Sequence, residues 1–298
     1  MDIHTLRQRV AQRDSISILE TVDVHTGTRT VLKEFDYVIE APNWTRDGRY
    51  LVYNSRGRMY TYELATGAIA EVDTGYAMDC NNDHVLSPDN AELAISHSTN
   101  DDATSRIYIL PFTGGNPRLV TEHGPSYLHG WSPDGKRLAY CAERGGQYDV
   151  YSISVDGGPE TQLTNTPGLD DGPEYTPDGT AIWFNSTRTG LMQIWRMDVD
   201  GSHPVQMVDE QANCWFPHVS PDGRWVVYIT YDAHDVAPNA HPANKHVELC
   251  LVPSDGGTST PIVKLFGGQG TMNVNSWSPD GKRLAYCAER GGQYDVYS

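Results

Sequence analysis

The chain has 298 residues, of which 38% are hydrophobic and 20% charged, and its formal net charge at pH 7 is -17. This negative charge argues against a general affinity for nucleic acid or for anionic membrane surfaces. No apolar run is long enough to span a bilayer. The 28 glycines, 18 prolines and 17 tyrosines favour a fold of turns and strands over one with a large helical core.

The first segment, residues 1–14, is expected to be short and separate from the main domain. Helical periodicity occurs only in residues 2–13, and the opening letters MDIHTLRQRVAQRDSIS contain no apolar stretch typical of a signal peptide. The sequence as given therefore predicts a cytoplasmic protein. A periplasmic location is the alternative if a signal peptide has been removed.

Residues 15–20 (SISILE) and 30–33 (TVLK) are the first predicted strands. Both are typical of the third and fourth strands of a repeating unit, yet no first and second strands precede them. The last unit of the chain has the opposite deficit, with predicted first and second strands at residues 274–277 and 282–287. We expect the two halves to join, because closure of this kind removes exposed sheet edges.

Between these halves one motif, S/T-x-D-G followed by an alternating strand, recurs along the chain. Its first four intervals are 42, 45, 44 and 44 residues and its last is 58, counted between the aspartates Asp47, Asp89, Asp134, Asp178, Asp222 and Asp280. Proline and glycine in this motif favour a tight turn. Each repeat contains four predicted strands, which is typical of a propeller blade.

The predicted fold is therefore an all-β, six-bladed propeller of four-stranded blades, forming a single domain over residues 15–298. The N-terminal strands complete the C-terminal blade. The predicted blades cover residues 41–75, 82–122, 127–166, 172–210, 215–265, and 273–292 together with 15–34.

The letters WSPDGKRLAY, with segments such as QIWRMDVDGS (residues 193–202) and DVYSISVDGG (residues 149–158), resemble the TolB-type propeller repeat. The resemblance covers nearly the whole chain and implies the same six-bladed fold. Related repeats build the propellers of prolyl-oligopeptidase-type peptidases and of oligogalacturonate lyases, so the repeat does not select a function. The chain departs from the peptidases because it has no G-x-S-x-G and no room for a hydrolase domain.

Residues 131–152 and 277–298 have the same 22 letters, WSPDGKRLAYCAERGGQYDVYS. Other blades differ at more than half of their positions, so we interpret the duplicate as the product of design or recombination. Its last six residues exceed what ring closure needs. Three alternatives follow for these six residues: they hang loose, they displace the N-terminal strands, or they pair with another molecule, which would be self-association through a C-terminal strand.

Propellers commonly bind ligands at one mouth of the central channel. We expect binding residues on the upper face, which is the face opposite the S-x-D-G turns. The candidates precede each repeat aspartate by four or five positions and are Asn43, His84, His129, Glu174, His218 and Asn275. Asp83 and Asp171 are close to them in sequence.

Four of these candidates, His84, His129, Glu174 and His218, could hold a divalent metal ion such as Mn, Zn or Ca. The resemblance to oligogalacturonate lyases, which have a histidine-rich metal centre, then implies a metal-dependent lyase or hydrolase of acidic oligosaccharides. The alternative is a polar, water-filled channel whose histidines bind water.

Two further features are predicted for the upper face. Its loops contain Arg144 and Arg188, which could bind a carboxylated ligand or could instead cap neighbouring backbone. Residues 232–246, with three histidines, form a long loop that either covers a binding site or is a tolerated insertion. Gln269 could reach the same mouth.

Five cysteines, an odd number without C-x-x-C spacing, predict free thiols in the core. The function expected first is a binding or interaction module for a protein or for a small acidic or carbohydrate ligand. A metal-dependent enzyme and an engineered propeller without selected activity are the alternatives.

Overall fold

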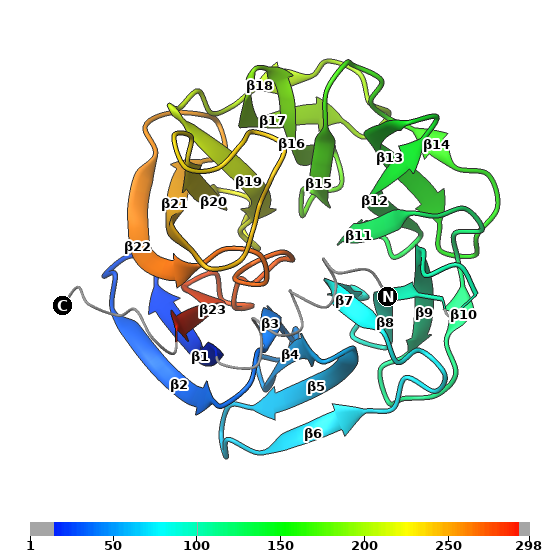
Figure 1. Cartoon of the computed structure of the whole chain (residues 1–298), viewed down its shortest axis with the longest axis vertical. Coiled ribbons are helices and arrows are strands. Elements are labelled where there is room, and N and C mark those ends of the chain that lie inside the picture. The colour runs from blue at the N-terminus through cyan, green and yellow to red at the C-terminus, as the bar shows by residue number, and fades with distance from the viewer. Residues whose placement is uncertain (1–14, 100, 292–298) are drawn as a thin grey trace.

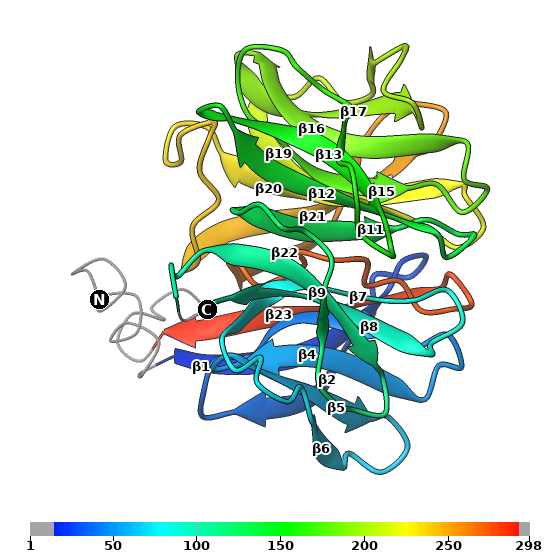
Figure 2. The ribbon, with the colours of Figure 1, turned by 90° about the vertical axis from the view of Figure 1, so that its right-hand side faces the viewer.

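The computed structural model describes residues 15–99 and 101–291. Six antiparallel sheets surround a common axis, and Figure 1 looks down that axis. Figure 2 shows the same ring from its side. The all-β, six-bladed propeller predicted from the repeat is confirmed. The helical periodicity of residues 2–13 and the letters QYDVYS of residues 293–298 lie outside the described residues.

Five blades are four-stranded and take their strands in chain order, so that each blade is a simple meander. Their strands, blade by blade, are β3 (Glu40–Trp44), β4 (Tyr50–Ser55), β5 (Arg58–Glu63) and β6 (Ile69–Val72); β7 (Cys80–Leu86), β8 (Glu92–Ser98), β9 (Ser105–Pro111) and β10 (Arg118–Leu119); β11 (Ser126–Trp131), β12 (Arg137–Arg144), β13 (Gln147–Ser154) and β14 (Thr161–Gln162); β15 (Asp170–Tyr175), β16 (Ala181–Thr189), β17 (Leu191–Asp198) and β18 (Val205–Gln206); β19 (Ala212–Val219), β20 (Trp225–Asp232), β21 (Lys245–Pro253) and β22 (Thr260–Gly267). The first strand of each blade lines the channel (Figure 1).

The sixth blade closes the ring and combines both ends of the described chain. β23 (Arg283–Gly291) pairs with β1 (Ser15–Asp23) over nine residues, and β1 pairs with β2 (Arg29–Phe35). The innermost position is taken by Trp277, which forms an isolated bridge with Leu284. The predicted closure by N-terminal strands is confirmed.

The repeated S-x-D-G motif forms the same turn in every blade. In the third blade Ser132 Oγ donates to Asp134 Oδ1 at 2.7 Å, and Asp134 Oδ1 accepts from the backbone of Lys136 at 3.0 Å. The glycine that follows has a positive φ, which costs a residue without Cβ little. In the second blade Asn90 replaces that glycine and keeps a φ of 60°, as asparagine tolerates the left-handed region.

The apolar core is divided among the interfaces between neighbouring blades. Between the second and third blades, for example, Ile107 and Ile109 pack with Leu128, Leu138 and Tyr140. This division follows from the repeat, because each small sheet has two apolar faces and buries them only against its neighbours. Among the described residues, no helix is long and apolar enough to cross a membrane.

Candidate functional site

A bulge in each of the first five inner strands sets the direction of its side chains at the channel. In four blades the inner strand holds one extra residue against its partner strand, as between Asp171 and Glu174 or between Trp215 and His218. In the second blade the irregularity between Cys80 and His84 contains two extra residues. A side chain that is equivalent in sequence therefore points elsewhere in this blade.

His84 is the residue most affected by this difference. It is fully buried, and neither ring nitrogen makes a hydrogen bond of normal geometry, although the backbone of Val52 and Ala41 lies close by. Burial lowers the pKa of His84 to about 4, so its ring is neutral at pH 7. His84 packs between the first and second blades and does not line the channel-mouth cavity described below.

Glu174 is the centre of a second environment, which joins the fourth, fifth and closing blades. Its carboxylate lies 2.6 Å from His218 Nδ1, and it accepts from the backbone of Val219 at 2.8 Å and from Asn275 Nδ2 at 2.6 Å. The amide of Asn43 donates to the Asn275 carbonyl oxygen. Four predicted site residues thus contact one another, and each is bonded within the channel wall.

His129 belongs to a third environment and faces acceptors with both ring nitrogens. Nε2 lies 3.0 Å from Asp171 Oδ1, and Nδ1 lies 3.3 Å from the carbonyl oxygen of Asn273. Burial disfavours the charged ring, but the charge and hydrogen bond of Asp171, aided by Asp83, outweigh burial and raise the pKa of His129 to about 9. Burial likewise opposes the ionised form of Asp171, but His129 lowers its pKa. The pair is ionic at neutral pH.

Above this pair a cavity of about 510 Å³ opens at the upper mouth of the channel. Four blades and two loops contribute its walls. The lining residues are Asn81, Asn82, Asp83, Tyr127, His129, Cys141, Tyr148, Leu169, Asp171, Phe216, Asn239, His241, Gln269 and Asn273. Its size lies within the usual range of small-molecule and peptide-anchor pockets.

Asp83 contributes the cavity's second carboxyl group. Burial raises its pKa to about 7, the negative charges of Asp171 and Glu40 add to this rise, and the charge of His129 opposes it. The residue is only 5% exposed. Asp83 is therefore a buried carboxyl whose ionised form is poorly compensated.

The long loop of residues 232–246 contributes Asn239 and His241 to the cavity wall. His241 packs against Trp215, with ring centroids 4.4 Å apart, and its Nδ1 is hydrogen-bonded to Gln269 Oε1. Burial lowers the pKa of His241. The long loop therefore borders a cavity, and Gln269 lines the same cavity.

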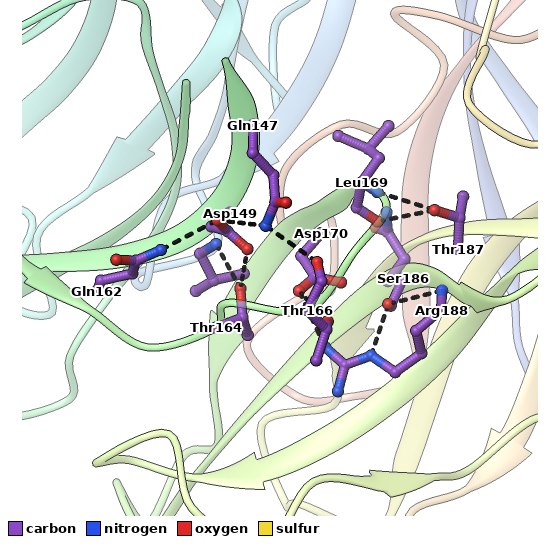
Figure 3. A network of polar contacts seen from close by, with 12 residues as sticks. Gln147, Asp149, Gln162, Thr164, Thr166, Leu169, Asp170, Ser186, Thr187 and Arg188 are labelled. Atoms are coloured by element: carbon purple, nitrogen blue, oxygen red, sulfur yellow. Dashed lines mark hydrogen bonds and ion pairs between the residues drawn. The ribbon is translucent and has the colours of Figure 1, made fainter. Parts of the chain in front are cut away.

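Arg144 and Arg188 are engaged in contacts with their own blades. Arg144 makes two hydrogen bonds to Glu160, at 2.9 and 2.6 Å, and others to backbone oxygens including that of Pro125. Arg188 is bonded to Asp170 and Ser186 in the polar network that Figure 3 shows. These contacts favour the capping interpretation over the binding of a carboxylated ligand.

The four predicted metal ligands lie in three separate environments. His84 is between two blades, Glu174 and His218 are paired, and His129 is bonded to Asp171. Within residues 15–99 and 101–291, no three His, Cys, Asp or Glu side chains are arranged to hold a metal ion. The predicted ligand set is therefore not gathered in this part of the chain.

Several cavity residues were not candidates from sequence. Tyr127 and Tyr148 belong to one blade, and Asn239 to the long loop. Tyr127 lies two positions before His129, on the same side of the strand, so strand periodicity was a usable signal for it. Asn239 had no such signal, because the path of a long loop depends on its tertiary contacts.

Comparison with known proteins gives consistent results. Residues 123–252 match the family described as the TolB beta propeller domain. An uncharacterized protein of Agrobacterium fabrum is 49% identical over 271 residues, which cover 91% of each chain. A solved structure from Agrobacterium tumefaciens, described as a presumed TolB, is 48% identical with a TM-score of 0.89 and covers 93% of this chain and 99% of its own.

Two further relatives match more distantly. The Tol-Pal system protein TolB of Francisella tularensis is 30% identical over 141 residues, which are 46% of this chain but only 32% of that protein. The crystal structure of TolB from Acinetobacter baumannii has a TM-score of 0.67 at 18% identity, covering 89% of this chain and 68% of its own. The second similarity shows the fold alone.

Proposed function

This chain belongs to the TolB β-propeller family, and from that membership we propose that it is a binding module whose partner protein docks at the upper mouth of the channel. The observation that carries the proposal is the cavity of about 510 Å³, whose walls come from four blades and two loops. A site built on rigid sheets holds its polar groups in fixed positions, which lowers the entropic cost of binding.

The lining of the cavity fits the recognition of a polypeptide. Asn81, Asn239 and Gln269 bring side-chain amides to the wall, and Tyr127 and Phe216 bring aromatic rings. Amides pair with backbone N–H and C=O groups, and aromatic side chains supply contact area at low conformational cost. A small acidic ligand is less well supported, because Arg144 and Arg188 are already bonded to Glu160 and Asp170.

The named relatives suggest where such a partner would be found. The proteins matched in Francisella tularensis are called Tol-Pal system protein TolB, and the 141 matched residues are 46% of this chain and 32% of that protein. We include membership of a Tol-Pal system in the proposal, with another component of that system as the partner.

Site-specific photocrosslinking tests the docking face. A photoreactive phenylalanine analogue replaces Asn239, which is exposed and lines the cavity, and in a matched variant it replaces Asp134, which is exposed in a turn on the opposite face. We expect a defined adduct from position 239 in the host cell and none from position 134. Equal adducts from both positions would contradict the proposal.

Binding of the crosslinked partner, once purified, gives the quantitative test. Asn239→Trp fills the cavity from an exposed position, and His234→Trp places the same side chain on the same loop away from the cavity lining. We expect the first variant to weaken binding about tenfold or more, a change of about 1.4 kcal/mol, and the second to leave it unchanged. Equal affinities for the two variants would exclude the mouth as the docking site.

A further inference from the structure

Asp83 is a buried acidic residue of the cavity, and within residues 15–99 and 101–291 it has no ion-pair partner. Asp83 is 5% exposed, and its side chain lines the cavity. Among the described residues, no Lys, Arg or His nitrogen lies within 4 Å of its carboxylate. The backbone N–H of Asp83 donates to Asn81 Oδ1 at 3.0 Å, and the Asn81 side chain lowers the pKa of the carboxyl group, but an amide carries no charge. A buried carboxyl group ordinarily either pairs with a cation or takes up a proton.

The two nearby imidazoles do not supply that cation. His129 is bonded to Asp171 at 3.0 Å, so its positive charge is shared with another carboxylate. His241 is partly buried and hydrogen-bonded to Gln269, and its burial lowers its pKa and so favours the neutral form. Two carboxyl groups therefore face one positive ring, and the cavity has a deficit of one positive charge when Asp83 is ionised.

The rest of the wall suits a particular kind of cation. Tyr127 and Tyr148 line the same space as Asp83, and aromatic faces attract cations. The negative charges of Asp83 and Asp171 both raise the pKa of the Tyr127 hydroxyl, after the larger effect of burial, so this hydroxyl lies near the two carboxyl groups. Asn81 Oδ1 already accepts from the backbone of Asp83, and Gln269 Oε1 is bonded to His241 Nδ1. A carbonyl oxygen has two lone pairs, so each can accept one further N–H donor.

We propose that the cavity binds a primary ammonium group of the partner, with Asp83 as its counter-ion and Tyr127 beside it. This inference rests on the proposed function, since it names the chemical group that enters the same mouth. A primary ammonium group has three N–H donors, and both a peptide N-terminus and a lysine side chain present one.

A small probe tests the inference without the partner. n-Butylammonium chloride is titrated into the purified chain, with n-butanol as the neutral probe of similar size and KCl as the ionic-strength control. The readouts are the thermal midpoint and NMR chemical shifts. We expect butylammonium to bind in the range of about 1 mM and to raise the midpoint, while n-butanol and KCl leave it unchanged.

Two substitutions assign the binding to Asp83. Asp83→Asn keeps the shape and removes the charge, and Asp101→Asn removes one charge from an exposed position on a loop of the same blade. We expect the first to weaken butylammonium binding about tenfold or more, equal to about 1.4 kcal/mol, and the second to change it less than about twofold. Equal affinity in Asp83→Asn and the parent chain would overturn the inference.

Asn239→Trp gives an independent check if Asp83→Asn does not fold, because position 239 is exposed. It should abolish the butylammonium shifts by filling the cavity, and unchanged shifts would contradict the site. Calcium chloride is titrated in parallel. A larger rise of the midpoint with calcium than with butylammonium would assign the cavity to an inorganic cation and overturn the ammonium proposal.

Two further probes distinguish the sources of the ammonium group. Gly-Gly-Gly carries a free N-terminal amine, and N-acetyl-lysine N-methylamide carries only the side-chain amine. If Gly-Gly-Gly binds and the binding depends on Asp83, the ammonium group comes from a peptide N-terminus. If the lysine derivative binds in this way, the ammonium group comes from a lysine side chain. If neither binds, the inference is wrong even where the crosslinking experiment succeeds; if either binds and no partner is crosslinked, only the docking proposal fails.

Discussion

His129 Nε2 lies 3.0 Å from Asp171 Oδ1, and this buried ion pair joins the inner strands of the third and fourth blades. The second ring nitrogen of His129 is bonded to the Asn273 carbonyl oxygen, which precedes the closing blade. One imidazole thus links three blades at the mouth of the channel. Its charge state is therefore coupled to the stability of the ring.

Asp171→Asn should lower the pKa of His129 and destabilise the protein. Breaking a buried ion pair costs about 3–5 kcal/mol, because one charge is left without its partner. The control is Asp198→Asn, which removes the partner of the exposed His203. Its cost should be below about 1 kcal/mol, as for other surface pairs. Urea unfolding at about pH 7 measures both changes in free energy.

The pH dependence of the same variant follows from the two pKa shifts. The pKa of His129 is raised from 6.5 to about 9, so its contribution is complete below pH 6.5 and is lost as the pH rises through about 9. The pKa of Asp171 is lowered from 3.8, so its contribution is lost as the pH falls through that lowered value. The difference in the free energy of unfolding between the parent chain and Asp171→Asn should therefore be smaller at about pH 10 than at about pH 7. A constant difference would contradict the ionic pairing.

Glu174→Ala should destabilise the channel wall by about 3 kcal/mol, because it leaves buried donors on His218 and Val219 without their acceptor and removes one of the two acceptors of Asn275 Nδ2. Glu122→Ala, at an exposed position, should change the free energy of unfolding by less than about 0.5 kcal/mol. Guanidinium unfolding compares the two. If both variants changed the free energy of unfolding by similarly small amounts, the Glu174 carboxylate would not hold the blades together.

Leu19→Ala should weaken the seam of the ring. Leu19 lies on β1 opposite Cys287 of β23 and is fully buried, and removal of a buried leucine side chain typically costs about 2–5 kcal/mol. Val31→Ala on β2, where the side chain is 55% exposed, is the matched control. Equal unfolding midpoints for the two variants would show that β1 is not part of the cooperative core.

The five cysteine thiols should not react with a thiol reagent in the native protein. All five are buried and free, and burial raises the pKa of Cys80 and Cys250 to about 12 and that of the other three well above 9. Thiolate is the reactive form. With a chromogenic disulfide reagent, the absorbance of the released leaving group should correspond to five thiols in the unfolded protein and to none in the native protein. Fast reaction of any thiol under native conditions would show local opening.

Deletion of residues 293–298 tests the predicted self-association. β23 already has β1 as its partner over nine residues, so closure does not require these letters, and the thermal midpoint should not fall. Size-exclusion chromatography with light scattering compares the oligomeric state of the two chains. A loss of dimer on deletion would support pairing between chains, and identical elution would exclude it.

The predicted fold followed from the regular spacing of Asp47, Asp89, Asp134, Asp178 and Asp222, because a turn that recurs at a constant interval defines the unit that repeats. Prediction of the site was less complete. His129, Asp83 and Gln269 line the cavity at the mouth, whereas His84 does not, since the bulge of its strand holds two extra residues. The spacing to the turn does not report the length of a bulge.

The repeated letters RLAYCAER separate what sequence and tertiary structure each decide. They form β12 in one blade and nearly all of β23 in another, and in both Tyr140 and Tyr286 are fully buried. The alternation of side-chain direction along these eight residues is enough to determine a strand that turns every second side chain toward the core. Their partners differ, because β12 pairs with the QYDVYSIS strand that follows it, whereas β23 pairs with β1 from the other end of the chain. Only the closed ring decides this pairing, since bringing β1 beside β23 buries both edges and the apolar seam between them.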